Sequence, residues 1–354
     1  MDDKDKKKRQ TKKEPLRNAN KSADQSAGAS QYGASTYGDV GGERAMPTKG
    51  IDSKKTVRAQ PSNEQEDWLT ELGPLADVMR ERGYEPLAKL GEGNYARVYK
   101  VKSKADGSEI AAKVIDFSTC SENYKVRFFP REMSILTKIH HPNIIQMLDV
   151  IQANTMIFIM MELAPNGTVV DFMRQHGAMP EWMCKGMFSQ ILDGLAYMHG
   201  LKIAHRDLKA ENILLTKSMR PKLCDFSYSV VCVHDEAGEM VLSKTFCGSI
   251  PYLPPEILQE QPYNPKRADV WSLGICFFVM LNNSLPFKFK DTSKMLQMQL
   301  NREFKYRPKI ERKNGISEQL KDVISKMLEP DPNLRITTKD LLAHPWFAEQ
   351  KKQK

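Results

Sequence analysis

The sequence predicts an α+β protein of two lobes, a small lobe with a five-stranded antiparallel sheet and one main helix, and a larger, mostly helical lobe. Three observations support this fold class. Apolar and polar residues alternate through most of 84–162, which is typical of strands. The apolar spacing becomes mainly helical after Asn166. Large apolar residues are scarce before about residue 66, which predicts a disordered N-terminal extension ahead of the lobes.

The chain is therefore divided by composition and pattern into four parts. These are a basic, low-complexity extension over 1–66, a short amphipathic segment over 67–83, a two-lobed domain over 84–347 and a short tail over 348–354. Within the domain, the small lobe is expected over 84–162 and the large lobe over 163–347. No internal repeat is visible.

The extension is rich in Ser, Gly, Ala, Lys and Gln, and it cannot bury enough apolar surface to offset its chain entropy. Its run "KDKKKRQTKK", residues 4–13, is either a solvated charge run or an address for the nucleus or for acidic surfaces. The amphipathic segment that follows is interrupted by Gly73 and Pro74, and we expect it to pack on the domain. Its apolar residues recur at roughly helical spacing: Trp68, Leu69, Leu72, Leu75, Val78 and Met79.

The bulk composition limits the classes of partner. The net charge of +9 arises from 53 basic and 44 acidic residues, and it indicates either a basic tail on an ordinary domain or an anionic partner. Nucleic-acid binding would depend on the tail alone, so it is disfavoured. The six cysteines form no Cys-x-x-Cys pair, which fits a reducing compartment. With no apolar signal core and no apolar run near the roughly 18 residues of a membrane span, we expect a cytoplasmic protein, with residues 4–13 as a candidate nuclear address.

The small lobe is predicted element by element. Residues 84–117 read as three antiparallel strands, with a turn at 105–108. "PREMSILTKI", residues 130–139, reads as a helix with Pro130 in its first turn. Residues 144–163 supply two more strands. In the large lobe, the clearest helices are "WMCKGMFSQILDGLAYMHG" and "ADVWSLGICFFVMLNN".

A glycine-rich turn, "GEGNYARV", lies between the first two strands. Backbone N–H groups in such a turn can approach phosphate oxygens, although the same pattern also occurs in ordinary hairpins. Ala96 stands at the third small position. The residues predicted to surround a nucleotide here are Leu90, Gly91, Glu92, Gly93, Asn94, Tyr95, Ala96, Arg97 and Val98.

Lys113 lies on the third strand and Glu132 on the predicted helix that follows. A lone strand lysine is usually just an exposed residue. A Lys–Glu pair in this position would instead hold the lysine against the α- and β-phosphates of a nucleotide.

The strongest signal is "HRDLKAEN", residues 205–212. In this pattern Asp207 can accept the proton of a substrate hydroxyl, Lys209 can reach the γ-phosphate, and Asn212 can hold a magnesium ion. Asp225 follows in the apolar "KLCDF" segment as a second metal ligand. The combination of these residues at these spacings is far better explained by a phosphotransfer site than by a role in the fold alone.

With these motifs the chain resembles the eukaryotic protein kinases over 84–347. "ADVWSLG" with Asp269, "HPWF" at 344–347, and "PPE" with Glu256 expected to pair with Arg335 extend the resemblance into the large lobe. It implies the bilobal kinase fold, ATP and Mg²⁺ bound between the lobes, and protein substrates phosphorylated on Ser or Thr. It also implies that Met161 limits the rear of the ATP pocket, next to a hinge that includes Glu162 and Ala164.

Finer matches point to a subgroup. Lys209 in "DLKAEN" and Ser249 in "CGS" resemble the serine/threonine-specific branch. "GEGNYARV", "FPREMSIL", "SKTFCGS" and "PYNPKRADVWSLG" resemble the testis-specific serine/threonine kinases of the calmodulin-kinase-like group, which implies a role in germ cells or sperm. Only 348–354 follow the domain, too little for a calmodulin-binding helix, so calmodulin is disfavoured as a partner.

The sequence departs from the family pattern at several positions. Ser227 stands in "LCDFSYS" where the family usually has glycine, and the resemblance implies that serine is tolerated there. Pro251 and Pro254 leave the local substrate groove uncertain because each lacks an N–H donor. Thr168 replaces an acid, which puts a simple preference for arginine in doubt, although Glu211 remains.

Two functions stay open at this point. One is an active serine/threonine protein kinase, favoured by retention of the motif residues, and the other is a pseudokinase that binds partners without efficient phosphotransfer. The resemblance also implies a switch: Arg206 would await a phosphate on the activation segment, and Thr245 in "SKTFCGS" is better placed than Ser249 to carry it. The alternative is that Thr245 is a plain exposed hydroxyl.

Overall fold

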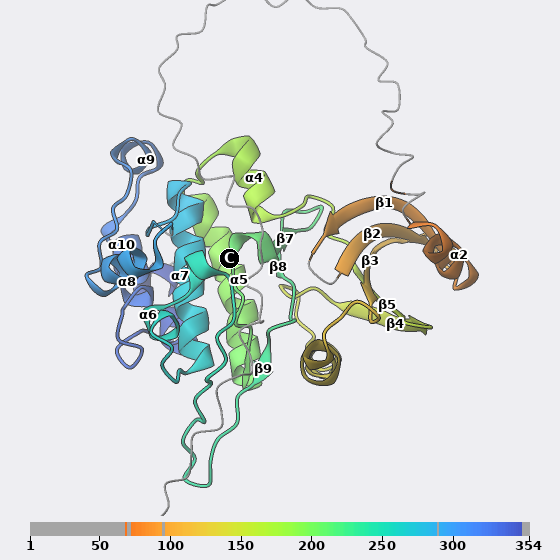
Figure 1. The fold of residues 1–354 in the computed structure, drawn as a ribbon. Coiled ribbons are helices and arrows are strands. Elements are labelled where there is room, and N and C mark those ends of the chain that lie inside the picture. Colours follow the sequence, from red (N-terminus) through yellow and green to blue (C-terminus); the bar gives the residue numbers. More distant parts are fainter. Residues whose placement is uncertain (1–67, 69–71, 94–95, 289, 349–354) are drawn as a thin grey trace, which may run out of the picture.

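The computed structural model describes residues 68, 72–93, 96–288 and 290–348. Two lobes lie side by side, a sheet-containing lobe and a larger helical lobe (Figure 1). The predicted bilobal α+β fold is confirmed. The expected extension over 1–66 and almost all of the expected tail lie outside the described residues.

The small lobe is built on a single antiparallel sheet with strand order β1-β2-β3-β5-β4. Apolar side chains on one face, such as those of Tyr99, Val101 and Ala112, are fully buried because that face is covered. The strands are β1 (Tyr84–Glu92), β2 (Ala96–Ser103), β3 (Glu109–Asp116), β4 (Met147–Ala153) and β5 (Met156–Glu162). Strand β5 pairs with β3. The hinge, which follows the end of β5, therefore lies next to the strand that carries Lys113.

A helix from the amphipathic segment covers the outer face of this sheet. The helix, α2 (Pro74–Glu81), begins where Gly73 adopts a φ of 46° and Pro74 supplies the first helical residue. Leu72 is also helical and Gly73 is a turn residue, so Gly73 and Pro74 interrupt the helical segment as predicted, and α2 begins after the interruption. Leu72 and Met79 are 1% and 2% exposed and pack on the sheet, so the expected contact with the domain is present. Leu69, assigned to the same apolar stripe, lies outside the described residues.

The main helix of the small lobe lies on the opposite face of the sheet. This helix, α3 (Phe129–Leu136), follows directly from a π-helical turn, η1 (Tyr124–Phe128). It begins one residue before the predicted 130–139 helix and ends at Leu136, after which the chain turns. The π-helical turn was not foreseen. Ile135 and Leu136 are buried, and Glu132 lies on the face directed at the sheet.

The large lobe is organised around two long helices, α5 (Glu181–Gly200) and α7 (Pro265–Asn282). Phe188 and Phe277 stack between them with ring centroids 3.6 Å apart. Almost every residue of α7 is buried, which accounts for its lack of a polar face. The other helices are α4 (Val169–His176), α6 (Pro255–Leu258), α8 (Thr292–Leu300), α9 (Pro308–Asn314), α10 (Glu318–Met327), α11 (Thr338–Leu342) and α12 (Pro345–Ala348). None of the helices in the described part of the chain combines the length and apolarity needed to cross a lipid bilayer.

Short strands and turns bring the motif-bearing loops to the boundary between the lobes. Strand pair β7/β8 lies on the large lobe beside the small-lobe sheet (Figure 1). In the pair β6/β9, β6 contacts α5 and α7, and β9 contacts α3. The amide of Ile145 donates to the carbonyl of Leu223 at 2.9 Å, which ties the two lobes together at this point. These elements are β6 (Ile203–Ala204), η2 (Ala210–Asn212), β7 (Ile213–Leu215), β8 (Pro221–Leu223), β9 (Val230–Val231) and η3 (Ile250–Tyr252).

The expected ion pair between Glu256 and Arg335 is present. Two guanidinium nitrogens of Arg335 lie 2.7 and 2.9 Å from the two carboxylate oxygens of Glu256, and both residues are buried. The bidentate geometry satisfies both charges where water is excluded. It attaches α6, at the end of the activation segment, to the loop before α11.

Candidate active site

The glycine-rich turn joins β1 to β2 at the edge of the lobe boundary. The amide of Gly93 donates to the carbonyl of Ala96 at 2.7 Å, which closes the turn. A Cβ atom added to Gly91 would meet open space, so backbone approach by a phosphate is unobstructed there. The carboxylate of Glu92 pairs with Lys89 at 2.7 Å and with Arg97 at 3.4 Å. Glu92 and Arg97 therefore interact with each other in this structure, while Asn94 and Tyr95 lie outside the described residues.

Lys113 on β3 is held by two carboxylates. Its Nζ atom lies 2.8 Å from Oε1 of Glu132 and 3.6 Å from Oδ1 of Asp225. Burial alone would lower the pKa of Lys113, but the charges of Glu132 and Asp225 raise it well above its usual value. The lysine is therefore a fixed positive charge, and the predicted Lys–Glu pair is formed.

The catalytic-loop residues converge on the carboxylate of Asp207. Its Oδ2 lies 3.0 Å from Nζ of Lys209, and its Oδ1 accepts from the hydroxyl of Ser249 at 2.9 Å. The Lys209 ammonium also donates to the Ser249 hydroxyl at 3.0 Å. Asp207 and Lys209 are 5% and 7% exposed, so this cluster sits in a fixed, nearly water-free arrangement.

The loop is anchored from below by Asp269 of α7, which is fully buried. Its two carboxylate oxygens accept the backbone amides of His205 and Arg206 at 2.8 and 2.7 Å, and the ring of His199 at 2.9 Å. Arg206 adopts a left-handed φ of 66°, which a non-glycine residue holds only when its surroundings enforce it. The hydrogen bonds from Asp269 hold the backbone in this conformation at the residue before Asp207.

Asn212 and Asp225 are brought together by the β7/β8 hairpin. Asn212 precedes β7, and Asp225 follows β8, whose Leu223 pairs with Ile213. The amide of Cys224 donates to the carbonyl of Asn212 at 3.0 Å and closes this end of the hairpin. The side-chain nitrogen of Asn212 donates to the carbonyl of Asp207 at 2.9 Å, which leaves its amide oxygen for another partner.

The donor set at this end of the hairpin fits a magnesium ion. It offers the amide oxygen of Asn212 and the carboxylate of Asp225, and Mg²⁺ prefers such oxygen ligands supplemented by water and substrate phosphates. Within the described residues, no group of three or more His, Cys, Asp or Glu side chains could hold a metal alone. Burial would raise the pKa of Asp225, but Lys113 and the Ser227 hydroxyl lower it to about 2. The carboxylate is thus charged and ready for a cation.

Sequence reasoning did not anticipate the contact that Ser227 makes. Its hydroxyl donates a hydrogen bond to Oδ1 of Asp225. Asp225 has a left-handed φ of 63°, whereas Ser227 has no positive φ. The serine at the usual glycine position therefore causes no left-handed backbone strain in this conformation. Only the spacing of two residues in "DFS" could have suggested this bond.

At the hinge, the side chain of Glu162 contacts Lys222 and the backbone of Gln146. Its Oε1 lies 2.6 Å from Nζ of Lys222 on β8 and accepts the amide of Gln146 at 2.8 Å. Met161 packs with Ile115 and Ile159 of the small-lobe core. These contacts engage Oε1 of the Glu162 side chain, and Ala164 follows two residues later in the connecting chain.

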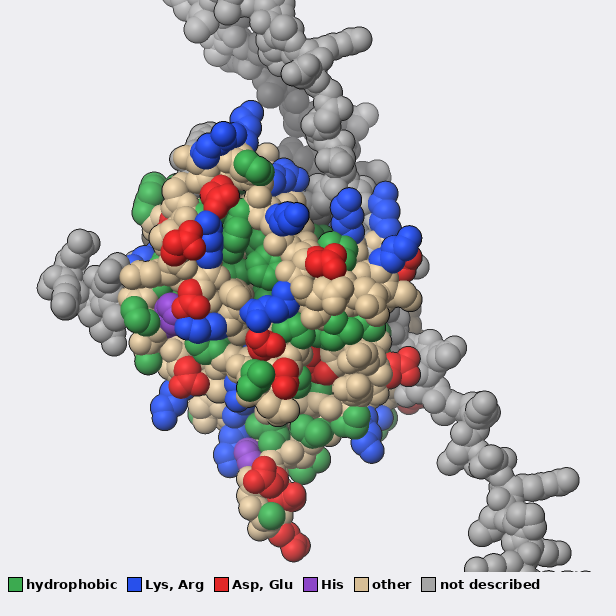
Figure 2. Space-filling view, turned by 90° about the vertical axis from the view of Figure 1, so that its left-hand side faces the viewer, with side chains coloured by type: hydrophobic (Ala, Val, Ile, Leu, Met, Phe, Trp, Pro, Cys, Tyr) green, Lys and Arg blue, Asp and Glu red, His purple; other side chains and the backbone are tan. Residues whose placement is uncertain are grey.

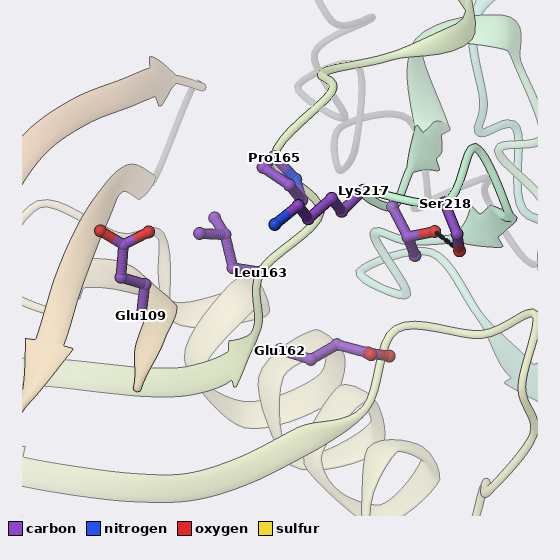
Figure 3. A pocket seen from close by; sticks show the side chains of 7 residues that line it. Glu109, Glu162, Leu163, Pro165, Lys217 and Ser218 are labelled. Atoms are coloured by element: carbon purple, nitrogen blue, oxygen red, sulfur yellow. Dashed lines mark hydrogen bonds between the residues drawn. The ribbon is translucent and has the colours of Figure 1, made fainter. Parts of the chain in front are cut away.

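A hollow of about 590 Å³ opens at this hinge. Figure 3 shows Glu109 and Leu163 on one side of it and Lys217 and Ser218 on the other. It is lined by Glu109, Glu162, Leu163, Pro165, Thr216, Lys217 and Ser218. Glu162 is the one lining residue that was also predicted to bind nucleotide, and the hollow includes neither Asp207 nor Asp225.

The activation segment, from Asp225 to Glu256, surrounds the side chain of Arg206. The Nη1 atom of Arg206 donates to the hydroxyl of Ser243 at 3.3 Å, and the amide of Thr245 donates to the same hydroxyl at 3.3 Å. The Ser243 hydroxyl thus links the backbone of Thr245 to the side chain of Arg206. Residues 234–240 form the tip of a hairpin that projects from the body, and mainly acidic side chains gather at this tip in Figure 2.

Comparisons with known proteins agree with this geometry. Residues 84–347 match the family model described as "Protein kinase domain". Testis-specific serine/threonine-protein kinase 2 of Mus musculus is 38% identical over 273 residues, covering 77% of this chain and 75% of that protein. Testis-specific serine/threonine-protein kinase 3 of the same species is 38% identical over 276 residues, covering 77% and 99%. Serine/threonine-protein kinase cds1 of Schizosaccharomyces pombe is 34% identical over 273 residues, covering 75% and 58%. The resemblance to the testis-specific serine/threonine kinases is confirmed.

Proposed function

The chain belongs to the protein kinase domain family and is a serine/threonine protein kinase, and from this premise we propose that Asp207 is its catalytic base. The reaction is transfer of the γ-phosphate of ATP to Ser or Thr hydroxyls of protein substrates. Such a transfer needs little covalent chemistry from the protein and depends on positioning and charge neutralisation.

The observation that carries this proposal is the convergence of Lys209 and Ser249 on the buried carboxylate of Asp207. Their contacts fix the carboxylate so that a remaining lone pair can accept the proton of the attacking hydroxyl. Lys209 stays within reach of the γ-phosphate and balances its charge. A carboxylate prepared in this way typically contributes about 10²–10⁴-fold to the rate.

The nucleotide would be held from the small lobe and its metal from the large lobe. Lys113, fixed by Glu132, presents its charge to the α- and β-phosphates, and backbone groups of the glycine-rich turn cover the phosphates. Asn212 and Asp225 would hold Mg²⁺, which supplies charge neutralisation on the phosphate oxygens. Met161 and the backbone of residues 162–164 would bound the adenine pocket.

The direct experiment is transfer of γ-phosphate from ATP with Mg²⁺ to a panel of Ser- and Thr-containing peptides. Turnover that disappears in Asp207→Asn supports the assignment, and the panel also reports the substrate preference. Nucleotide binding without turnover in the wild-type protein would instead favour the pseudokinase, a scaffold that binds partners.

For regulation, we propose Thr245 as a phosphorylated switch that acts through Arg206. Arg206 is 7% exposed, and within the described residues its Nη2 atom has no hydrogen-bond partner. Burial, followed by the positive charges of Arg206 and Arg127, lowers the pKa of Arg131, so Arg131 and Arg206 repel one another and would both be stabilised by a nearby anion. A phosphate brings about −1.5 to −2 charges, which would satisfy this basic cluster and order the segment.

The biological setting is proposed from the relatives. Proteins named testis-specific kinases share 38% identity with this chain, which supports a role in germ cells or sperm. We propose a cytoplasmic location, with the basic run at residues 4–13 as a candidate nuclear address. Removal of that run and imaging of the tagged protein tests this placement.

A further inference from the structure

We propose that Ser227 is a positioning residue that holds the Asp225 carboxylate for Mg²⁺, with one oxygen fixed by the protein and the other presented to the metal. The inference depends on the proposed function, in which Asp225 is a metal ligand. It assigns a positive role to the residue that stands where the family usually has glycine.

The contacts of Asp225 are divided unequally between its two oxygens. Oδ1 accepts the hydroxyl of Ser227 and lies 3.6 Å from Nζ of Lys113. Within the described part of the chain, Oδ2 has no hydrogen bond or ion pair. The Asp225 side chain is 39% exposed, so the carboxylate remains accessible to a ligand. This arrangement favours a ligand that binds the metal through Oδ2.

The backbone places the Ser227 hydroxyl for this task. The amide of Ser229 donates to the carbonyl of Phe226 at 2.9 Å, so Ser227 lies inside a tight turn directed back to Asp225. Phe226 is 2% exposed, and its ring centroid lies 5.2 Å from that of His205. Because the Phe226 side chain is buried in the core, the position of the turn that carries Ser227 is fixed as well.

A hydrogen bond of this kind has a known physical consequence. A carboxylate that rotates freely must be ordered when it binds a metal, whereas one held by an outer partner is already oriented. Loss of such an outer partner typically lowers metal affinity by about 10–100-fold. Glycine at this position has no hydroxyl, so in this chain the serine supplies orientation that a glycine cannot.

The test measures how much Mg²⁺ strengthens binding of a non-hydrolysable ATP analogue. Calorimetry in EDTA and in saturating Mg²⁺ gives the two affinities, and their ratio reports the coupling between metal and nucleotide. We expect Ser227→Ala to reduce this ratio about tenfold, the lower end of that range, with the affinity in EDTA unchanged. Ser227→Thr retains the hydroxyl and should retain the wild-type ratio.

Three results separate the possibilities. An unchanged ratio in Ser227→Ala, or a larger one, overturns the positioning role, since a larger ratio means that the hydroxyl competes with the metal. Where the ratio is unchanged because the affinities in EDTA and in Mg²⁺ fall equally, the loss is a general structural effect. Asp225→Ala distinguishes the two proposals: if it too leaves the ratio unchanged, then Asp225 is not the metal ligand and the proposed function fails at that residue.

Discussion

Lys113 on β3 and Glu132 on α3 form a buried ion pair across the small lobe, with Nζ 2.8 Å from Oε1. The same ammonium lies 3.6 Å from Asp225 of the large lobe. One side chain therefore connects the sheet, the main helix and the end of the β7/β8 hairpin that carries Asp225. The position of α3 is thereby coupled to the position of the charge that would meet the nucleotide.

Glu132→Gln should weaken catalysis by loosening Lys113. The substitution keeps the shape of the side chain but removes a charge-assisted hydrogen bond, which is typically worth about 1.5–3 kcal/mol. We expect kcat/KM for ATP to fall about tenfold to a hundredfold, at about 1.4 kcal/mol per decade. Steady-state kinetics checks this, with Glu122→Gln as the matched control, since Glu122 is an exposed partner of Lys125. Wild-type kinetics in Glu132→Gln would show that the pair is not needed.

Asp207→Asn should abolish phosphotransfer and leave the domain folded. The asparagine can still accept the Ser249 hydroxyl, but it cannot take up a proton at neutral pH. We expect turnover to fall by about 10²–10⁴-fold with little change in Tm. A purified peptide assay and a thermal melt measure the two effects, with Asp77→Asn on the exposed side of α2 as the control. Near-native turnover would contradict the role of Asp207.

Much of this site could be predicted because its motifs are contiguous in the chain. "HRDLKAEN" fixes the identity and order of Asp207, Lys209 and Asn212, and the fold needs only to support one loop. The Lys113–Glu132 pair was predictable because a strand and the next helix carry its partners. The bilobal fold followed from the change of apolar period near Asn166.

Other contacts depend on geometry that no local pattern encodes. The link between Glu162 and Lys222 joins the hinge to β8, and the sequence places these residues far apart. The bond from Arg206 to Ser243 depends on the path of the activation segment, which has little regular structure to predict it. The π-helical turn over Tyr124–Phe128 was missed because the helix was predicted to begin only at residue 130, and π-helical turns are rare.

Inhibitors that require a flipped Asp-Phe-Ser segment should bind poorly. Flipping would withdraw Phe226 from its buried site and break the bond from Ser227 to Asp225. We also expect the Met161 side chain to narrow the rear of the ATP pocket. We expect Ser227→Gly to strengthen binding of such a compound while activity at saturating Mg²⁺ stays within about tenfold, or roughly 1.4 kcal/mol. Calorimetry with one flip-dependent and one flip-independent inhibitor separates the effects. Tight binding of the flip-dependent compound to the wild-type protein would refute the idea.

The helix α2 should stabilise the small lobe although it precedes the family-matched region at residue 84. Leu72, just before the helix, and Met79 within it are nearly fully buried against the sheet, and truncation of such a side chain to alanine typically costs about 2–5 kcal/mol. We therefore expect Leu72→Ala and Met79→Ala to lower the free energy of unfolding by that amount, measured in urea. Asp77→Ala, on the exposed face of the same helix, is the control. A variant that begins at residue 84 and melts like the full chain would show that α2 is dispensable.

Phosphorylation of Thr245 should raise activity by giving Arg206 a charged partner. In the present structure Arg206 reaches the Ser243 hydroxyl, and Ser243 is held by backbone bonds to Tyr263 at 2.8 and 2.9 Å. Thr245 is half-buried beside that hydroxyl, and a phosphate on it would pair with Nη2 of Arg206, which has no hydrogen-bond partner among the described residues. Thr245→Ala should lower turnover several-fold without lowering Tm, and mass spectrometry of active protein should find the phosphate at Thr245.

Ser243→Ala is the informative companion to that experiment. It removes the hydroxyl that now accepts from Arg206 but leaves the proposed phosphate acceptor in place, so phosphorylated Ser243→Ala protein should remain active. If activity instead follows phosphate on Ser243, then the switch lies two residues earlier than proposed. Fully active protein with Thr245 unmodified would remove Thr245 from the mechanism, because the charge of Arg206 would then be tolerated without any phosphate.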